Sequence, residues 1–426
     1  MSRLVKRQDF RDAWVLIDRP ESGNDNAWHL FCYLRQTQPG VNAYYVLDET
    51  SPRNESARCR FGKRIVRFRS YEWKELMARC SVLISSQLTR TIRDHPELKD
   101  VIERRSAPWV FAYLSHGVAR GDNLKTISWA EIDFRTSATP SEHRQSVSSN
   151  HPFGRSEENT ALTGLCRWDS LISGPITSDA DAPLLILAPT WRHSLVTQIA
   201  STGMEMEIRI AEFLQSAWLT HWSRLIELIQ EENARNTKRF KVKLLAHPQM
   251  RQIAEIWPSL GLPDIDFLLY DDVDFQAILK SASQVVTDYS SIAFDVAVLR
   301  KPLVYFHFEG HEDASNGHTE PGYFDYDVDG FGPVVTTAND ALREILSAAE
   351  REFRQEDRFA ARAAEELVLA DGLACERTFR AIEAFMRQSR VAEQPSVGRK
   401  PGSRRLLGRR YRWNDSAQPI PLRNPT

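Results

Sequence analysis

Short apolar runs alternate with segments of helical periodicity along most of the chain. Strand-like runs of buried character occur at 13–18, 43–48, 81–85, 109–115, 184–190, 240–248, 266–270, 284–290 and 302–308. Helical spacing occurs at 25–37, 71–79, 208–231, 249–257, 273–280 and 290–299. Such alternation is typical of βα units, so we expect an α/β protein built on mostly parallel sheets.

The chain divides near its middle. Its 426 residues exceed what one hydrophobic core usually serves, and the Ser-, Asp- and Pro-rich segment 170–183 interrupts the pattern, which places a linker at 173–183. We expect two Rossmann-like, doubly wound domains, 1–172 and 184–345, that face a shared cleft.

The end of the chain has a different pattern. After residue 338 it becomes helical, and one face near the end is apolar: Phe379, Ile382, Phe385 and Met386. We therefore expect C-terminal helices over 346–390, followed by a basic tail over 391–426.

The net charge of −2 hides an asymmetry. Residues 387–426 hold ten Lys and Arg against Glu393 and Asp415, so this end carries +8 and the rest −10. The tail is also rich in proline, which predicts a segment without a fixed fold. Two interpretations remain open: residues 399–413 attach to an anionic membrane surface, or the tail only aids solubility.

Several protein classes lack support. No apolar run approaches 18 residues and no signal peptide is evident, so we expect a cytoplasmic protein, free or peripheral on the inner face of the plasma membrane. Five scattered cysteines without a CxxC pair indicate free thiols. No P-loop, GxGxxG, HExxH or GxSxG motif occurs. We expect no metal, no cofactor and no nucleic-acid partner.

Polar residues follow several predicted strands, where parallel sheets bind ligands. His116, followed by Gly117, is placed for general-base chemistry. His247 ends a strand of the second half. Arg192 carries a planar guanidinium suited to phosphate. A lone histidine is more often structural than functional. Arg192, taken alone, is equally consistent with a surface ion pair.

The strongest local signal lies at 284–299. A buried strand leads into Thr287, Asp288 and Tyr289, and Ser290 and Ser291 then stand at the start of a helix. A capping role explains one of these polar residues. Several hydroxyls beside a helix amino terminus predict an anion site that suits a pyrophosphate.

These segments resemble the CDP-glycerol glycerophosphotransferase family of teichoic acid and capsule synthesis. The likeness runs from Arg19 and DNAWHLFCYLR (25–35) through YLSHG (113–117), TGLCRWDSL (163–171), LAPTWR (187–192) and AHP (246–248) to TDYSSIAFDVAVLRKPLVYF (287–306) and GYFDYDVDGFGPVV (322–335). After His-Gly the chain departs from the family's common Thr-Pro-Leu-Lys, because Val118-Ala119-Arg120 stands there.

The resemblance implies a GT-B-like architecture with the nucleotide held mainly by the second domain. It implies that His116 and His247 are catalytic. The implied donor-phosphate residues are Arg192, Thr287, Asp288, Ser290 and Ser291. Residues expected to bind the acceptor or support the site are Gly117, Arg120, Arg167 and Asp169.

The implied reaction transfers an alditol phosphate, with glycerol phosphate from CDP-glycerol as the first candidate, to a hydroxyl of a polymer or lipid-linked acceptor. His116 would deprotonate that hydroxyl, CMP would leave, and an Asp or Glu that the sequence does not identify would orient the ring. Two alternatives remain open: a GT-B glycosyltransferase that uses a nucleotide sugar, and a non-catalytic subunit of a surface-polymer assembly.

Overall fold

The computed structural model describes most of the chain. The described residues are 9–87, 95–105, 109–119, 132–148, 156–175, 182–192, 204–235, 240–247, 250–270, 272–308 and 322–393. Arg120, Pro248, residues 176–181 of the linker and the membrane-binding candidate 399–413 lie outside them.

The first lobe is built on a seven-stranded parallel sheet in the order β3-β2-β1-β4-β5-β6-β7. Its strands are β1 (Ala13–Leu16), β2 (Ala43–Leu47), β3 (Ile65–Arg67), β4 (Cys80–Ser85), β5 (Val110–Tyr113), β6 (Phe134–Ser137) and β7 (Thr160–Leu162). Its helices are α1 (Asn26–Thr37), α2 (Asn54–Phe61), α3 (Tyr71–Arg79), α5 (Lys99–Glu103), α6 (Pro140–Ser146) and α7 (Cys166–Ile172). β1 pairs with both β2 and β4, so the strand order reverses beside β1.

The second lobe repeats this plan with six parallel strands in the order β10-β9-β8-β11-β12-β13. The strands are β8 (Leu184–Ala188), β9 (Lys241–Ala246), β10 (Asp266–Leu269), β11 (Gln284–Thr287), β12 (Leu303–Phe306) and β13 (Val334–Val335). The helices are α9 (Met204–Leu214), α10 (Ala217–Arg235), α11 (Arg251–Ile256), α12 (Phe275–Ser281) and α13 (Ile292–Val298). Here the order reverses beside β8, which pairs with β9 and β11.

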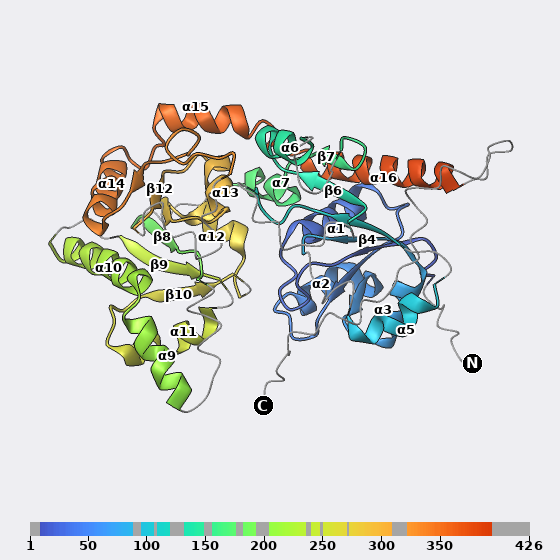
Figure 1. Ribbon diagram of the computed structural model, residues 1–426, viewed down its shortest axis with the longest axis horizontal. Helices are drawn as coiled ribbons and strands as arrows, with labels where there is room; N and C mark the ends of the chain where they lie inside the picture. Colours follow the sequence, from blue (N-terminus) through green and yellow to red (C-terminus); the bar gives the residue numbers. More distant parts are fainter. Residues whose placement is uncertain are drawn as a thin grey trace.

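Three helices end the described chain: α14 (Ala338–Glu350), α15 (Asp357–Glu366) and α16 (Ala374–Glu393). Figure 1 shows α14 and α15 on the second lobe and α16, in red, lying along the first. The apolar face expected from the sequence holds α16 there: Phe379 packs on Trp14 with ring centroids 5.8 Å apart, and Phe385 packs on Phe134 at 5.2 Å. The chain thus crosses between the lobes twice.

The nine predicted strands are all present, and four further strands were missed. Those missed are β3, β6, β7 and β13, which have two to four residues each. β6 has the sequence FRTS, which lacks the apolar run of the predicted strands. Its Arg135 is buried nonetheless, because it pairs with Glu142. The single helix expected at 208–231 is wrong, because α9 ends at Leu214 and α10 begins at Ala217. The Oγ of Ser216, just before α10, accepts from the Leu219 amide at 3.2 Å.

Within the described residues, no helix is long and apolar enough to cross a membrane. In the same residues, no group of three or more His, Cys, Asp or Glu side chains is arranged to hold a metal ion.

Candidate active site

A cavity of about 570 Å³ lies between the two lobes, at the carboxyl ends of their strands. Residues that follow strands line it from both sides: Asp18, Arg19, Gln87, His116 and Gly117 from the first lobe, and Pro189, Thr190, Trp191, His247, Ser290 and Ser291 from the second. The points where the two strand orders reverse therefore face the same space, which is where open α/β sheets bind ligands. The volume suits a small molecule.

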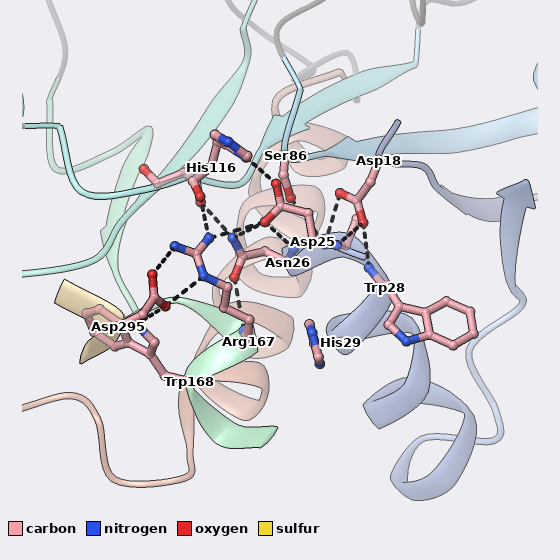
Figure 2. Close-up of polar contacts among 12 residues, drawn as sticks. Asp18, Asp25, Asn26, Trp28, His29, Ser86, His116, Arg167, Trp168 and Asp295 are labelled. Atoms are coloured by element: carbon pink, nitrogen blue, oxygen red, sulfur yellow. Dashed lines mark hydrogen bonds and ion pairs between the residues drawn. The ribbon is translucent and has the colours of Figure 1, made fainter. Parts of the chain in front are cut away.

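His116 follows β5, and Asp25, the residue that caps α1, holds its ring. Nδ1 of His116 pairs with Oδ2 of Asp25 (Figure 2). Nε2 of Gln87 lies 3.2 Å from that ring nitrogen and 3.3 Å from the same carboxylate oxygen. An ionised carboxylate only accepts, so Nδ1 carries the proton and Nε2 is the basic atom of the neutral ring. The His116 side chain is 55% exposed, which leaves that base accessible from the cavity.

Asp25 is held in its charged form. Burial alone would raise its pKa, but attraction to His116 and Arg167, with hydrogen bonds from His116 and the Asn26 amide, lowers the pKa to about 2. The Asn26 amide donates to Oδ1 at 2.8 Å. Asp25 is therefore an anion at neutral pH and stabilises a proton gained by His116.

A second carboxylate, Asp18, is buried beside Asp25 at the end of β1. Its oxygens accept from the amides of Trp28 at 2.9 Å and Ala27 at 3.3 Å, and from the Tyr45 hydroxyl at 3.0 Å. Burial and the charge of Asp25 raise the pKa of Asp18 to about 6. The two carboxylates occupy the amino terminus of α1, the position where Rossmann-like folds often bind phosphate. In the first lobe, this helix end orients His116 instead.

Arg167 joins His116 and Asp25 to the other lobe. Its Nε and Nη2 donate to the two oxygens of Asp295 on α13, each at 2.8 Å (Figure 2). Its Nη1 donates to Asp25 at 3.3 Å and to the carbonyl of His116. Burial disfavours the cation, but the two carboxylates outweigh it and raise the pKa of Arg167. Arg167, expected to bind the acceptor or support the site, is thus placed as a support.

His247 lies on the opposite wall, after β9. Its ring stacks on Trp191 with centroids 5.4 Å apart. Nη2 of Arg19, from the first lobe, lies 3.4 Å from Nε2 of His247. A guanidinium only donates, so Nε2 accepts and the ring is neutral in this contact, with its proton on Nδ1. Both predicted catalytic histidines therefore line one cavity, each from its own lobe.

Three of the expected phosphate ligands lie behind the cavity wall. Arg192 is 2% exposed and pairs with Asp288 at 3.1 Å. Asp288 also accepts from the amide of Thr190 at 2.8 Å, and the hydroxyl of Thr287 donates to the carbonyl of Ala188 at 2.6 Å. The sequence predicted that these residues contact phosphate directly. Instead, these polar groups at the strand ends are buried and bond to neighbouring protein groups. They support Thr190, which does line the cavity.

Ser290 and Ser291 line the cavity at the start of α13. The Ser290 hydroxyl accepts from the amide of Ile292 at 3.3 Å. Gly117, from the first lobe, packs directly on Ser291. A Cβ at position 117 would overlap the Ser291 hydroxyl. The His-Gly element and the serine pair therefore meet at the boundary between the lobes.

Asp169 does not line the cavity. Its carboxylate accepts from the amides of Ala374 and Cys375 at 2.9 and 2.8 Å, so it holds the amino terminus of α16. Arg120, the other expected support residue, lies outside the described residues.

Four residues of the site were not predicted from the sequence: Asp25, Asp18, Gln87 and Asp295. Two of them left a signal. Asp25 stands where a helix cap is expected, before an apolar-periodic segment, and Asp295 interrupts the apolar stripe of α13, where a buried charge needs a partner. Gln87 had no comparable signal, because it follows a strand in a stretch without helical periodicity.

Comparison with known proteins identifies the family. The profile of the CDP-Glycerol:Poly(glycerophosphate) glycerophosphotransferase family matches residues 2–384. The chain belongs to this family. The resemblance noted in the motifs is therefore confirmed over nearly the whole chain.

Two relatives come from Bacillus subtilis (strain 168). The minor teichoic acid biosynthesis protein GgaB is 26% identical over 365 residues, which cover 82% of this chain and 37% of GgaB. The teichoic acid poly(glycerol phosphate) polymerase is 24% identical over 187 residues, which cover 43% of this chain and 22% of the polymerase. The chain therefore matches well under half of the length of either relative.

Solved structures bear out the predicted fold. A structure of the wall teichoic acid polymerase TagF superimposes with a TM-score of 0.60 at 14% identity, over 91% of this chain and 93% of that one. The S. aureus MnaA–UDP co-structure gives 0.55 at 12% identity, over 91% and 99%. The predicted α/β, GT-B-like fold of this family member is confirmed.

Proposed function

We propose that the protein transfers an alditol phosphate, glycerol phosphate from CDP-glycerol in the first instance, to a hydroxyl of a polymer or lipid-linked acceptor and releases CMP. The observation that carries the proposal is the pairing of His116 with Asp25 in a cavity whose other wall holds His247. Family membership supports the donor class.

The reaction begins at His116. The acceptor hydroxyl gives its proton to Nε2 of His116, and its oxygen bonds to the β-phosphorus of the donor. The bond from that phosphorus to the bridging oxygen breaks, and CMP leaves with the electron pair. Asp25 stabilises the imidazolium that forms, because it remains ionised with a pKa of about 2.

The second lobe binds the nucleotide in this proposal. Ser290 and Ser291 offer hydroxyls to the phosphates, and Trp191 and Tyr289 line the same wall as flat apolar surfaces. Tyr289 is held in place by stacking on His307, with ring centroids 4.2 Å apart. Asp288 and Arg192 act from behind that wall by fixing the loop after β8.

The test is a donor screen with matched histidine variants. Purified protein is incubated with CDP-glycerol, CDP-ribitol and UDP-sugars in separate reactions, with a glycerol phosphate oligomer as acceptor. With CDP-glycerol, the protein should release CMP and extend the oligomer. His116→Ala and His247→Ala should lower the rate at least 10²-fold. His143→Ala is the control, because His143 pairs with Glu157 at 2.9 Å, away from the cavity.

Other outcomes of the screen select the alternatives. Release of UDP from a UDP-sugar in place of CMP would identify a glycosyltransferase. Full activity of both histidine variants in a cell-based polymer assay would favour a non-catalytic subunit.

We further propose that residues 399–413 attach the protein to an anionic membrane surface. This segment contains seven Lys and Arg together with Leu406, Leu407, Tyr411 and Trp413. Basic residues near such a surface contribute about 1 kcal/mol each. Attachment would bring the cavity close to a lipid-linked acceptor.

A further inference from the structure

Arg19 differs from the other described arginines that line the cavity. Arg135 pairs with Glu142 at 2.8 Å, and Arg167 pairs with Asp25 and Asp295. Arg19 makes no ion pair with a carboxylate among the described residues, and its guanidinium instead faces the neutral ring of His247. Among the residues that the structure describes, half-buried Arg19 therefore lacks the anionic partner that a guanidinium binds best.

The backbone of Arg19 is anchored although its side chain crosses to the other lobe. The carbonyl of Arg19 accepts from the amides of Ser22 and Gly23 at 3.1 and 2.8 Å. Gly23 has a φ of +58°, and a side chain there would overlap Leu47, so this turn needs glycine. The turn presents Arg19 from a fixed base, and only its flexible stem needs to move when an anion enters.

We propose that Arg19 binds the distal phosphate of the donor diphosphate and, in doing so, releases Nε2 of His247. The inference rests on the proposed function, because it takes the donor to be a nucleoside diphosphate derivative. Arg19 would supply the diphosphate with a cation from the first lobe, in place of Arg192, which is buried. The phosphate contacted is the one that is transferred, since Arg19 and His116 belong to the same lobe.

The exchange has a chemical consequence. While Arg19 donates to Nε2, His247 cannot carry a proton on that atom. Once the phosphate takes the guanidinium, Nε2 can take up a proton from solvent and donate it toward the oxygens on which charge develops. Donor binding thereby converts His247 from an acceptor into a donor, so the catalytic form of the ring arises only when donor is present.

The experiment compares nucleotide binding by calorimetry for the full chain and two variants. Arg19→Gln should weaken CDP binding about 10- to 100-fold, the loss expected for a charge-assisted hydrogen bond, and change CMP binding less than about threefold. Arg19→Lys should keep more of the CDP affinity, because it retains the charge without the planar fork. Arg67→Gln is the matched control, since Arg67 pairs with Glu49 at the surface of the same lobe.

The outcomes separate the two proposals. If the wild type binds CDP and releases CMP from CDP-glycerol but Arg19→Gln binds CDP equally well, the assignment of Arg19 is wrong and the proposed function stands. An equal loss of CDP and CMP affinity overturns the distal-phosphate assignment. If the wild type neither binds CDP nor turns over CDP-glycerol, both proposals fail. Thermal unfolding checks that each variant is folded.

Discussion

His116 and Asp25 act as one unit although 91 positions separate them in the chain. The carboxylate selects the ring tautomer that leaves Nε2 basic, and its own charge is secured by Arg167 and the Asn26 amide. A histidine at a strand end was visible in the sequence. Its orienting carboxylate was not, because Asp25 looked like an ordinary helix cap and serves as one too.

Replacing Asp25 by Asn tests this unit. The amide can present a donor to Nδ1, which favours the wrong tautomer and removes the charge that stabilises the imidazolium. We expect CMP release from CDP-glycerol to fall at least 10²-fold, while CDP binding changes little. Asp9→Asn, which alters a surface carboxylate of the same lobe, should retain wild-type activity. An active Asp25→Asn enzyme would remove Asp25 from the mechanism.

The raised pKa of Asp18 predicts that the stability of the protein depends on pH. Its pKa rises from 3.8 to about 6 on folding, so its stabilising contribution is complete below about pH 3.8 and is lost as the pH rises through about 6. The contribution of Asp25, whose pKa is lowered to about 2, has the opposite sign and is already complete above pH 5. The relevant window is therefore pH 4.5 to 7.5.

Asp18→Asn removes this titration. Between pH 4.5 and 7.5 the free energy of unfolding of the wild type should fall relative to that of the variant by about 2 kcal/mol, from about 1.4 kcal/mol per pKa unit. Urea denaturation of both proteins at four pH values measures the difference. A difference that is constant with pH would show that Asp18 keeps an ordinary pKa.

At the scale of elements, the site depends on the loops after strands and on the short helices α7 and α13. The sequence predicted α13 and its two leading serines. It did not predict that Asp288 and Arg192 would pair behind the wall, because the loops after β8 and β11 are adjacent only once those strands pair. Element identity follows from local periodicity, whereas these contacts follow from sheet order.

The contact between Gly117 and Ser291 gives a prediction at this scale. Gly117→Ala places a methyl group against the Ser291 hydroxyl, so the loop after β5 and the start of α13 must separate. We expect a loss of about 1–3 kcal/mol in stability and slower CMP release. Adding Ser291→Gly should restore most of the stability, as measured by urea denaturation. A double variant no more stable than Gly117→Ala would refute the contact.

At the scale of the whole molecule, α16 and the α7–α13 contact hold the lobes together. α16 follows the second lobe in sequence but packs on the first, where Asp169 caps it. Arg167 and Trp168 reach Asp295 across the same boundary. The lobes are therefore tied to each other at this boundary, and the cavity also lies between them.

The tail supplies a prediction for the entire chain. Removing residues 391–426 should lower binding to vesicles containing anionic lipid at least tenfold at low salt, and the wild-type binding should weaken as salt increases. A full-length variant with Arg404, Arg405, Arg409 and Arg410 changed to Gln is the matched control for charge. Binding to neutral vesicles gives the baseline. Equal binding of all three proteins would leave the tail without a membrane role.

The sequence by itself determined the two α/β lobes, nine of the strands, the family and the two histidines at strand ends. It could do so because apolar periodicity and strand-end motifs are properties of neighbouring residues. Only the tertiary structure decided which carboxylate orients His116, that Arg192 is neutralised by Asp288, and that Arg19 reaches His247. The residues in these contacts are far apart in sequence; Arg19 and His247 are separated by 228 positions. Strand order and the contact between the lobes bring them together, and local sequence patterns do not encode either.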